Sequence, residues 1–350
     1  MKKIVILVCV LCMILPAAVV GCGPAAGSQG VVYVHNWGEY IDESIFRIFE
    51  RETGIKVHYS TFETNEQLYS LMRRGGANID VIIPSDYMIA RMVEEGMLEE
   101  LNFSNIPNFS LIDERYKGLA YDPGNRFSVA YMTGTVGIIY NSSLVTGPVV
   151  SWSALFNENY SGQILMFDNP RDAFGIALKQ LGHSLNTTNE DEIREAFDLL
   201  VWQRPILQAY VMDQIFDKLE SGEAWIGPYY AGDFLVMAEN NPDLRFARPS
   251  EGTNFFVDAM CVPKGAPNKE NAEIFINFMT RTDIALKNME YIFYASANAE
   301  AAAEFAAEMN PEDYAIMFAS SEVLANSEIY VHLPRHILEL YDQLWVELKR

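Results

Sequence analysis

The stretch VVYVHNWGEYIDESIFRIFERETGIKVHYS, residues 31–60, decides the fold. Residues 31–34 and 55–60 are two apolar runs of strand length. Between them, residues 42–53 repeat apolar side chains at helical spacing and stop before Gly54, a residue type that commonly ends helices. A strand, a helix and a second strand in this order predict parallel strands joined by a crossover helix.

The alternation continues along the chain. The next predicted elements are a helix at 64–73, a strand at 79–84 and a helix at 88–95, which complete a βαβαβα unit. Periodicity is lost between residues 102 and 125. Two β runs follow at 127–132 and 136–141, split by Thr133-Gly134-Thr135. We interpret that break as a crossing from one lobe to another.

A second alternating unit follows the crossing. Its predicted elements are a strand at 163–167, helices at 173–181 and 191–202, a strand at 224–228, a helix at 234–239, strands at 244–248 and 255–263, and helices at 269–281, 283–289 and 334–349. Two such units predict an α/β protein of two lobes, joined by a hinge, with a ligand cleft between them. We expect residues 31–134 and 259–302 to form lobe 1, and residues 135–258 and 303–350 to form lobe 2.

The first 30 residues predict export and lipid attachment. Lys2 and Lys3 precede an apolar run at 4–20 that is short for a membrane span, as in a signal peptide. Val19-Val20-Gly21-Cys22 resembles a bacterial lipobox. We therefore expect a lipoprotein signal peptide at 1–21, lipid on Cys22 and a linker at 22–30, although an ordinary secretory signal is the alternative. The mature protein would be extracytoplasmic, anchored by lipid to the cell membrane, in the periplasm or on the outer face of the cytoplasmic membrane.

Composition argues against several classes of function. The chain carries 47 acidic and 25 basic residues, a net charge of −22 that becomes −24 when residues 1–21 are removed. Nucleic acid is therefore an unexpected partner, because phosphate binding needs clustered Lys and Arg. The five histidines lack metal-ligand spacing, and we expect no metal and no cofactor.

Cys261 lies in an apolar run and is predicted to be a buried structural thiol. Without a recognised catalytic motif, we expect no enzyme.

Aromatic and acidic residues recur directly after the predicted strands. In open α/β sheets, ligands bind beyond the carboxyl ends of the strands, so these positions identify the candidate site. They are Asn36-Trp37-Gly38-Glu39-Tyr40, Ser85-Asp86-Tyr87, Asp168-Asn169-Pro170-Arg171-Asp172, Tyr229-Tyr230-Ala231-Gly232-Asp233, Phe256 with Asp258, and Tyr291, Phe293 and Tyr294.

This combination of side chains suits an organic cation. Aromatic faces attract an ammonium group by about 0.5–2 kcal/mol each and also cover a methylene chain. A buried ammonium group without a counter-ion costs several kcal/mol, so a diamine needs a carboxylate at each end of its slot. Any one of these loops could be ordinary surface or core, and the repetition over several strand ends is the stronger signal.

Several blocks, in the same order, resemble the spermidine/putrescine-binding proteins of polyamine ABC importers, a branch of the bacterial extracellular solute-binding proteins. The blocks are Asn36-Trp37-Gly38-Glu39-Tyr40, Glu52-Thr53-Gly54-Ile55-Lys56-Val57, Tyr59-Ser60-Thr61 with Asn65-Glu66, Asp80-Val81-Ile82-Ile83-Pro84-Ser85, and Ile276-Asn277-Phe278 with Asp283. The resemblance covers nearly all of the chain after residue 30. It implies a fold like that of periplasmic binding proteins and a monomeric receptor, which closes on putrescine or spermidine and delivers it to the membrane subunits of an ABC permease.

The resemblance also implies which residues bind the ligand. The family's ligand residues fall on Trp37, Glu39, Tyr40, Ser85, Tyr87, Asp172, Tyr230, Asp233, Phe256, Asp258 and Tyr294. The aromatic residues would line the slot, while Asp258 and either Asp172 or Asp233 would bind the ammonium groups. Glu39 and Ser85 would add hydrogen bonds.

The chain departs from the family pattern at four positions. Asn169 replaces an acid of spermidine-preferring members, Tyr230 and Phe256 replace tryptophans of some members, and Tyr330 stands where a glutamine is often found. Losing the acid at Asn169 removes a partner for a third ammonium group. We therefore predict a preference for putrescine, with spermidine close behind.

Three other functions stay open from the sequence. The first is a receptor for another organic cation, such as an amino acid or thiamine. The second is a polysaccharide or ester hydrolase that uses a pair of acids in the cleft, which would show turnover. The third is a surface adhesin with a degenerate slot, which would show no ligand-induced rise in melting temperature.

Overall fold

The structure is a computed structural model that describes residues 30–75 and 78–350. The predicted signal peptide, Cys22 and nearly all of the predicted linker lie outside the described residues, so lipid attachment stays a prediction. Within the described ranges, no helix is long and apolar enough to span a membrane.

The elements alternate between strands and helices over most of the chain. The strands are β1 (Val31–Trp37), β2 (Lys56–Phe62), β3 (Val81–Ile82), β4 (Ser128–Asn141), β5 (Ile164–Phe167), β6 (Leu207–Val211), β7 (Ile226–Tyr230), β8 (Leu244–Ala247), β9 (Thr253–Cys261), β10 (Ala295–Ser296) and β11 (Ser327–Glu328). The α-helices are α1 (Ser44–Thr53), α2 (Asn65–Arg73), α3 (Asp86–Glu94), α4 (Pro170–Gln180), α5 (Glu190–Gln203), α6 (Ile215–Glu220), α7 (Ala231–Asn240), α8 (Lys269–Met279), α9 (Thr282–Ile292), α10 (Ala299–Glu308), α11 (Pro311–Met317), α12 (Ser321–Ala325) and α13 (Arg335–Leu348).

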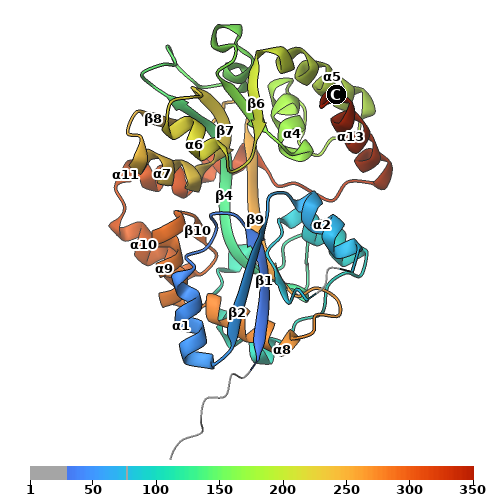
Figure 1. Cartoon of the computed structure of the whole chain (residues 1–350), viewed down its shortest axis with the longest axis vertical. Helices are drawn as coiled ribbons and strands as arrows, with labels where there is room; N and C mark the ends of the chain where they lie inside the picture. Colours follow the sequence, from blue (N-terminus) through green and yellow to red (C-terminus); the bar gives the residue numbers. More distant parts are fainter. Residues whose placement is uncertain (1–29, 76–77) are drawn as a thin grey trace, which may run out of the picture.

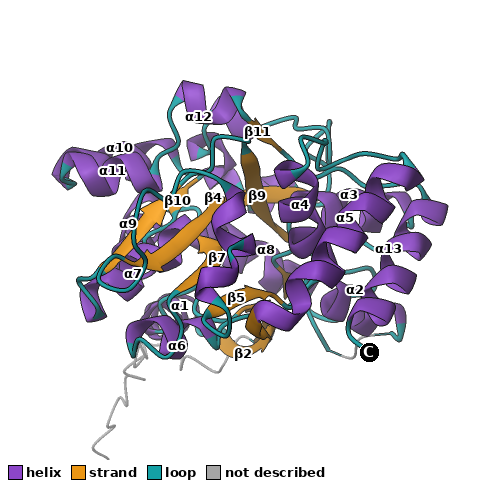
Figure 2. Ribbon diagram, turned by 90° about the horizontal axis from the view of Figure 1, so that it is seen from above, coloured by secondary structure: helices purple, strands orange, loops and turns teal. Residues whose placement is uncertain are grey.

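The strands form two α/β lobes, which confirms the predicted fold class. Along the sheet the order is β2-β1-β3-β9-β4-β7-β5-β6. The pairs β1–β2, β1–β3, β5–β6 and β5–β7 are parallel, as the alternating pattern predicts. Figure 1 shows β1 and β2 in the lower lobe and β6, β7 and β8 in the upper lobe, while Figure 2 shows the helices around the strands.

The two lobes are connected by β4 and β9, which run antiparallel to each other. Residues 128–135 of β4 pair with β9, and residues 136–141 pair with β7 and β8. The predicted crossing is therefore confirmed, but the predicted break at Thr133-Gly134-Thr135 is wrong. These residues continue one 14-residue strand, because both threonines are buried and β-branched residues favour extended backbone.

The lower lobe forms its core between α1, α8 and the parallel strands. Ile45 and Phe49 of α1 are fully buried, and the Phe49 ring packs edge-on against Phe275 of α8 at 5.3 Å between centroids. Burial of one such side chain stabilises the fold by about 1.5–3 kcal/mol. Gly54 ends α1 with a φ of 75°, a left-handed conformation that glycine adopts without strain.

Other elements differ from the sequence prediction. The strand β6 was not predicted, because Gln208 interrupts its short apolar run and four of its five residues are only half-buried. The helices α6, α10, α11 and α12 and the two-residue strands β10 and β11 were also not predicted. Cys261 is buried in β9, as expected for a structural thiol.

Candidate functional site

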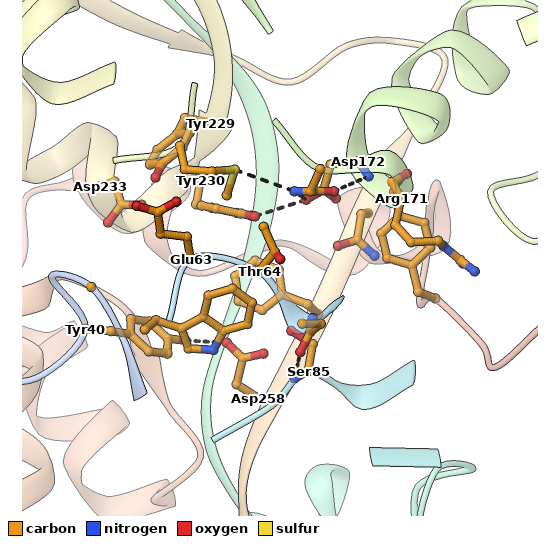
Figure 3. Close-up of a pocket in the computed structure, with 18 of the residues that line it drawn as sticks. Tyr40, Glu63, Thr64, Ser85, Arg171, Asp172, Tyr229, Tyr230, Asp233 and Asp258 are labelled. Carbon is orange, nitrogen blue, oxygen red and sulfur yellow. Dashed lines mark hydrogen bonds between the residues drawn. The ribbon is translucent and has the colours of Figure 1, made fainter. Parts of the chain in front are cut away.

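A cavity lies between the lobes, where the loops after several strands converge (Figure 3). It encloses about 740 Å³ of empty space, part of it open to solvent. Its walls come from the loop after β1, the N-terminal turns of α2, α3, α4 and α7, the loop after β6, and the middle of β9. We call this cavity the slot. Each of the strand-end segments singled out in the sequence therefore contributes at least one residue to one space.

Aromatic rings form a continuous wall of the slot. The Tyr230 and Phe256 ring centroids are 5.5 Å apart, and those of Phe256 and Tyr294 are 6.2 Å apart. Tyr40 then meets Tyr294 edge-on at 4.7 Å. Such rings can cover an alkyl chain and attract an ammonium group with their faces.

Trp37 is held in place by its own contacts. Its indole nitrogen donates a hydrogen bond to the carbonyl oxygen of Ile83 at 2.8 Å, and its ring packs against Phe62 at 4.5 Å. The indole therefore reaches the slot from the end of β1 in a fixed orientation.

Three carboxylates lie along the aromatic wall, and each accepts a hydrogen bond from a tyrosine. The Tyr230 hydroxyl donates to Asp172 at 3.0 Å, the Tyr40 hydroxyl to Asp258 at 2.8 Å and the Tyr294 hydroxyl to Asp233 at 2.8 Å. Asp258 is 4% exposed, and its second carboxylate oxygen has no partner among the described residues. The tyrosine bonds orient the acids but leave capacity to bind a cation.

Burial raises the pKa values of these acids. Removal from water is the largest cause in each case, and it raises the pKa of Asp258 to about 7. The pKa values of Asp172 and Asp233 are also raised by burial. Since burial penalises the charged carboxylates, an ammonium ligand would stabilise their ionised forms.

Asp86 is a further buried acid, at the N-terminus of α3. It accepts hydrogen bonds from the backbone nitrogens of Tyr87 at 2.7 Å and Val257 at 3.1 Å. Burial nevertheless raises its pKa to about 8. Its contact with Val257 ties α3 to β9 beneath the slot.

One end of the slot holds a buried guanidinium group. Arg171 is 4% exposed, and its carbon Cζ lies 4.5 Å from the ring centroid of Tyr330 and 5.1 Å from that of Tyr87. Two of its nitrogens, Nε and Nη1, lack hydrogen-bond partners in the described structure. Glu66 accepts a hydrogen bond from the Tyr87 hydroxyl at 3.0 Å beside it. This end therefore already contains a positive charge.

The structure brings together ten of the eleven ligand residues that the resemblance implies. Those lining the slot are Trp37, Tyr40, Ser85, Tyr87, Asp172, Tyr230, Asp233, Phe256, Asp258 and Tyr294. Glu39 does not line it. Its backbone is left-handed, with a φ of 46°, and the residue is exposed in the turn between Trp37 and Tyr40. The predicted hydrogen bond between Glu39 and a ligand stays a prediction.

Sequence reasoning missed several charged residues of the slot. They are Glu63, Glu66, Asp86, Arg171 and Asp213. Asp86 and Arg171 lie inside the strand-end segments but were given no role. Asp213 follows β6, so recognition of that strand would have identified it by the same strand-end rule.

No metal centre is evident in the part of the chain that the structure describes. Among these residues, no group of three or more His, Cys, Asp or Glu side chains could hold a metal ion. The acids of the slot are separated by aromatic rings and bonded to tyrosines, an arrangement better suited to an extended organic cation.

Comparisons with known proteins agree with the architecture. Residues 44–317 match the family model described as "Bacterial extracellular solute-binding protein". The spermidine/putrescine-binding periplasmic protein of Escherichia coli K12 is 33% identical over 306 residues, which are 87% of this chain and 87% of that protein.

Two solved structures share the fold over their whole length. PotD, a spermidine/putrescine ABC transporter substrate-binding protein of Streptococcus pneumoniae, superimposes with a TM-score of 0.76 at 32% identity, covering 92% of this chain and 99% of PotD. The TpPotD lipoprotein of Treponema pallidum gives a TM-score of 0.81 at 26% identity, with 91% and 99% covered. This chain belongs to the bacterial extracellular solute-binding protein family.

Proposed function

We propose that this protein is the membrane-tethered substrate-binding component of a polyamine ABC importer. It captures putrescine, spermidine or both between its lobes and delivers the polyamine to the permease. The observation that carries this proposal is the aromatic slot with its three tyrosine-bonded carboxylates, Asp172, Asp258 and Asp233. An aliphatic diamine has the complementary chemistry, an apolar chain with an ammonium group at each end.

The similar proteins support the same ligand class. The names of the Escherichia coli and Streptococcus pneumoniae relatives state spermidine/putrescine binding. Their similarity extends over most of this chain, and this chain has acids and aromatic residues around the cleft. Transfer to a permease requires capture and release, and no covalent step.

Ligand capture involves lobe closure in this proposal. Lobe 1 comprises residues 31–134 and 259–302, lobe 2 comprises residues 135–258 and 303–350, and the hinge lies where β4 and β9 cross. Since the slot is lined from both lobes, a ligand that contacts both favours the closed arrangement.

The proposed location is extracytoplasmic. Lipid on Cys22 would anchor a monomeric receptor to the cell membrane through the linker that precedes β1. A lipoprotein among the similar structures is consistent with this arrangement.

Putrescine is the ligand that we propose to bind more tightly. Asn169 accepts a hydrogen bond from the backbone nitrogen of Asp172 and donates one to its carboxylate, both at 2.8 Å. It therefore orients one acid without adding a second charge. Arg171 lies beside this end, and its guanidinium group would repel an additional ammonium group.

Calorimetry on the chain from Gly23 onward, which keeps every described element, tests the proposal. After any co-purified ligand is removed, we expect putrescine to bind with micromolar or tighter affinity at both low and high salt. Spermidine should bind more weakly. Absence of heat with both polyamines on folded protein would contradict polyamine binding, whereas much tighter spermidine binding would contradict only the preference.

A further inference from the structure

A second cavity adjoins the slot, and its lining includes Glu66 and Gln67 of α2 and Asp342 and Trp345 of α13. Figure 1 shows α2 in the lower lobe and α13 in the upper lobe. The cavity contains about 900 Å³ of empty space, part of it open to solvent. Its lining includes Glu63, Thr64, Glu66 and Met212, which also line the slot. The two cavities are therefore neighbours that share a wall.

The wall of the second cavity combines acids with aromatic rings. The acids are Glu63, Glu66, Asp168 and Asp342, and the rings are those of Tyr210 and Trp345. Tyr210 and Trp345 meet edge-on, with centroids 5.6 Å apart. This is the same chemistry as in the slot, and Asp168, Asp342 and the two rings do not line the slot.

An ammonium group of the chain contacts three residues of this wall, although Lys349 itself does not line the cavity. The Lys349 ammonium nitrogen lies 2.7 Å from a carboxylate oxygen of Asp168 and 4.1 Å from the centroid of the Tyr210 ring. It is also 5.3 Å from the centroid of Trp345. A carboxylate and two rings thus hold the end of an alkylammonium chain, which is the group that a polyamine presents.

The other acids of the cavity form no ion pair among the described residues, although Arg171 of the slot lies beside Glu66. Among the described residues, no Lys, Arg or His nitrogen lies within ion-pair distance of a carboxylate oxygen of Glu63, Glu66 or Asp342. One carboxylate oxygen of Glu66 and the hydroxyl of Tyr210 are buried without a hydrogen-bond partner. These atoms point to a polar ligand group that the chain itself does not supply.

We propose that the second cavity is a subsite for a primary alkylammonium group, such as one end of an aliphatic diamine. The ligand competes with the tethered Lys349 ammonium for Asp168 and the two rings. The choice of diamines as ligands rests on the proposed function, but the subsite residues to be tested, Asp342 and Trp345, do not line the slot. The subsite is partly open to solvent, so its ligand binds more weakly than one enclosed in the slot.

Removal of the tethered competitor gives the first test. Putrescine is titrated into the chain from Gly23 onward up to millimolar concentration, and we expect a tight event followed by a weak one. Lys349→Ala should strengthen the weak event by about threefold or more and leave the tight event unchanged. Lys264→Ala is the matched control, since it removes the same charge from an exposed residue that pairs with the half-buried Glu99 in the other lobe.

Substitution of Trp345 leaves the net charge unchanged. It therefore distinguishes binding at the subsite from nonspecific attraction of a cation to an acidic protein. Trp345→Ala should weaken the second event by about threefold or more, while Trp345→Phe should largely retain it. Asp342→Asn provides a second test on an exposed side chain, with the exposed Asp243→Asn as its control. Unchanged tight binding shows that the variants are folded.

The outcomes distinguish this inference from the proposed function. Two events that respond as described support the subsite. A single event in the unaltered chain, or a weak event insensitive to Lys349→Ala, Trp345→Ala and Asp342→Asn, overturns it. Loss of the tight event alone would contradict the proposed function and leave the subsite supported.

Discussion

Asp258 couples ligand binding to protons at the scale of a single residue. Its burial raises the pKa to about 7, so at pH 6 most empty slots carry a neutral Asp258. An ammonium ligand needs the carboxylate and must displace that proton. We predict that putrescine affinity falls about tenfold from pH 8 to pH 6, the change for one group with this pKa. Calorimetry in two buffers of different ionisation enthalpy would also detect proton release at pH 6.

The control for this prediction is Asp258→Asn. The amide oxygen can still accept the Tyr40 hydrogen bond, so the variant should fold, bind putrescine more weakly and show a smaller pH dependence. Equal affinity at pH 6 and pH 8 in the unaltered protein would rule out the coupling.

The stability of the empty protein changes with pH in the opposite direction to putrescine affinity. Asp86 and Asp258 bind protons more tightly in the folded protein than in the unfolded chain. They therefore lower the stability of the empty protein as pH rises from about 4 to 8.

At the scale of elements, the pairing of β4 with β9 shapes the aromatic wall. Gly134 lies opposite Phe256 in this ladder, and a Cβ atom on Gly134 would come within 2.6 Å of the Phe256 ring. We predict that Gly134→Ala displaces the ring and weakens putrescine binding up to about tenfold. The crowding should also destabilise the protein by about 1–3 kcal/mol, measurable by chemical denaturation.

Gly124→Ala is the matched control for that substitution. Its Cβ atom would meet only the movable side chain of Arg126, at 3.3 Å, away from the slot. We expect its putrescine affinity to equal that of the unaltered protein. If Gly134→Ala also bound putrescine with unaltered affinity, binding would not depend on the position of the Phe256 ring.

The elements also show how far sequence reasoning reaches. Helix α1 was predictable because Ile45, Phe46 and Phe49 repeat at helical spacing and Gly54 ends the helix. Most slot residues followed from the strand-end rule together with the family resemblance. The strand β6 has no such pattern, and its omission hid Asp213. The exposure of Glu39 depends on a left-handed turn, which neighbouring residue types did not predict.

At the scale of the whole molecule, the short distance between Gly38 and Asp213 shows how closely the two lobes approach each other. Gly38 follows β1 in one lobe, and Asp213 follows β6 in the other. A Cβ atom on Gly38 would lie only 2.2 Å from a carboxylate oxygen of Asp213. We predict that Gly38→Val prevents full closure and weakens putrescine binding by about 100-fold, since the ligand then loses contacts with one lobe. Small-angle X-ray scattering should show a smaller putrescine-induced decrease in the radius of gyration.

A double variant separates obstruction from damage to the binding loop. Asp213→Ala removes the group that Gly38→Val would strike, so the double variant should close and bind putrescine more tightly than Gly38→Val alone. The expected coupling is about 1 kcal/mol or more, as for side chains in direct contact. Additive losses, with unchanged scattering in all variants, would mean that these residues do not approach each other during closure. Because each residue belongs to a different lobe, rescue would be direct evidence that binding requires the lobes to close.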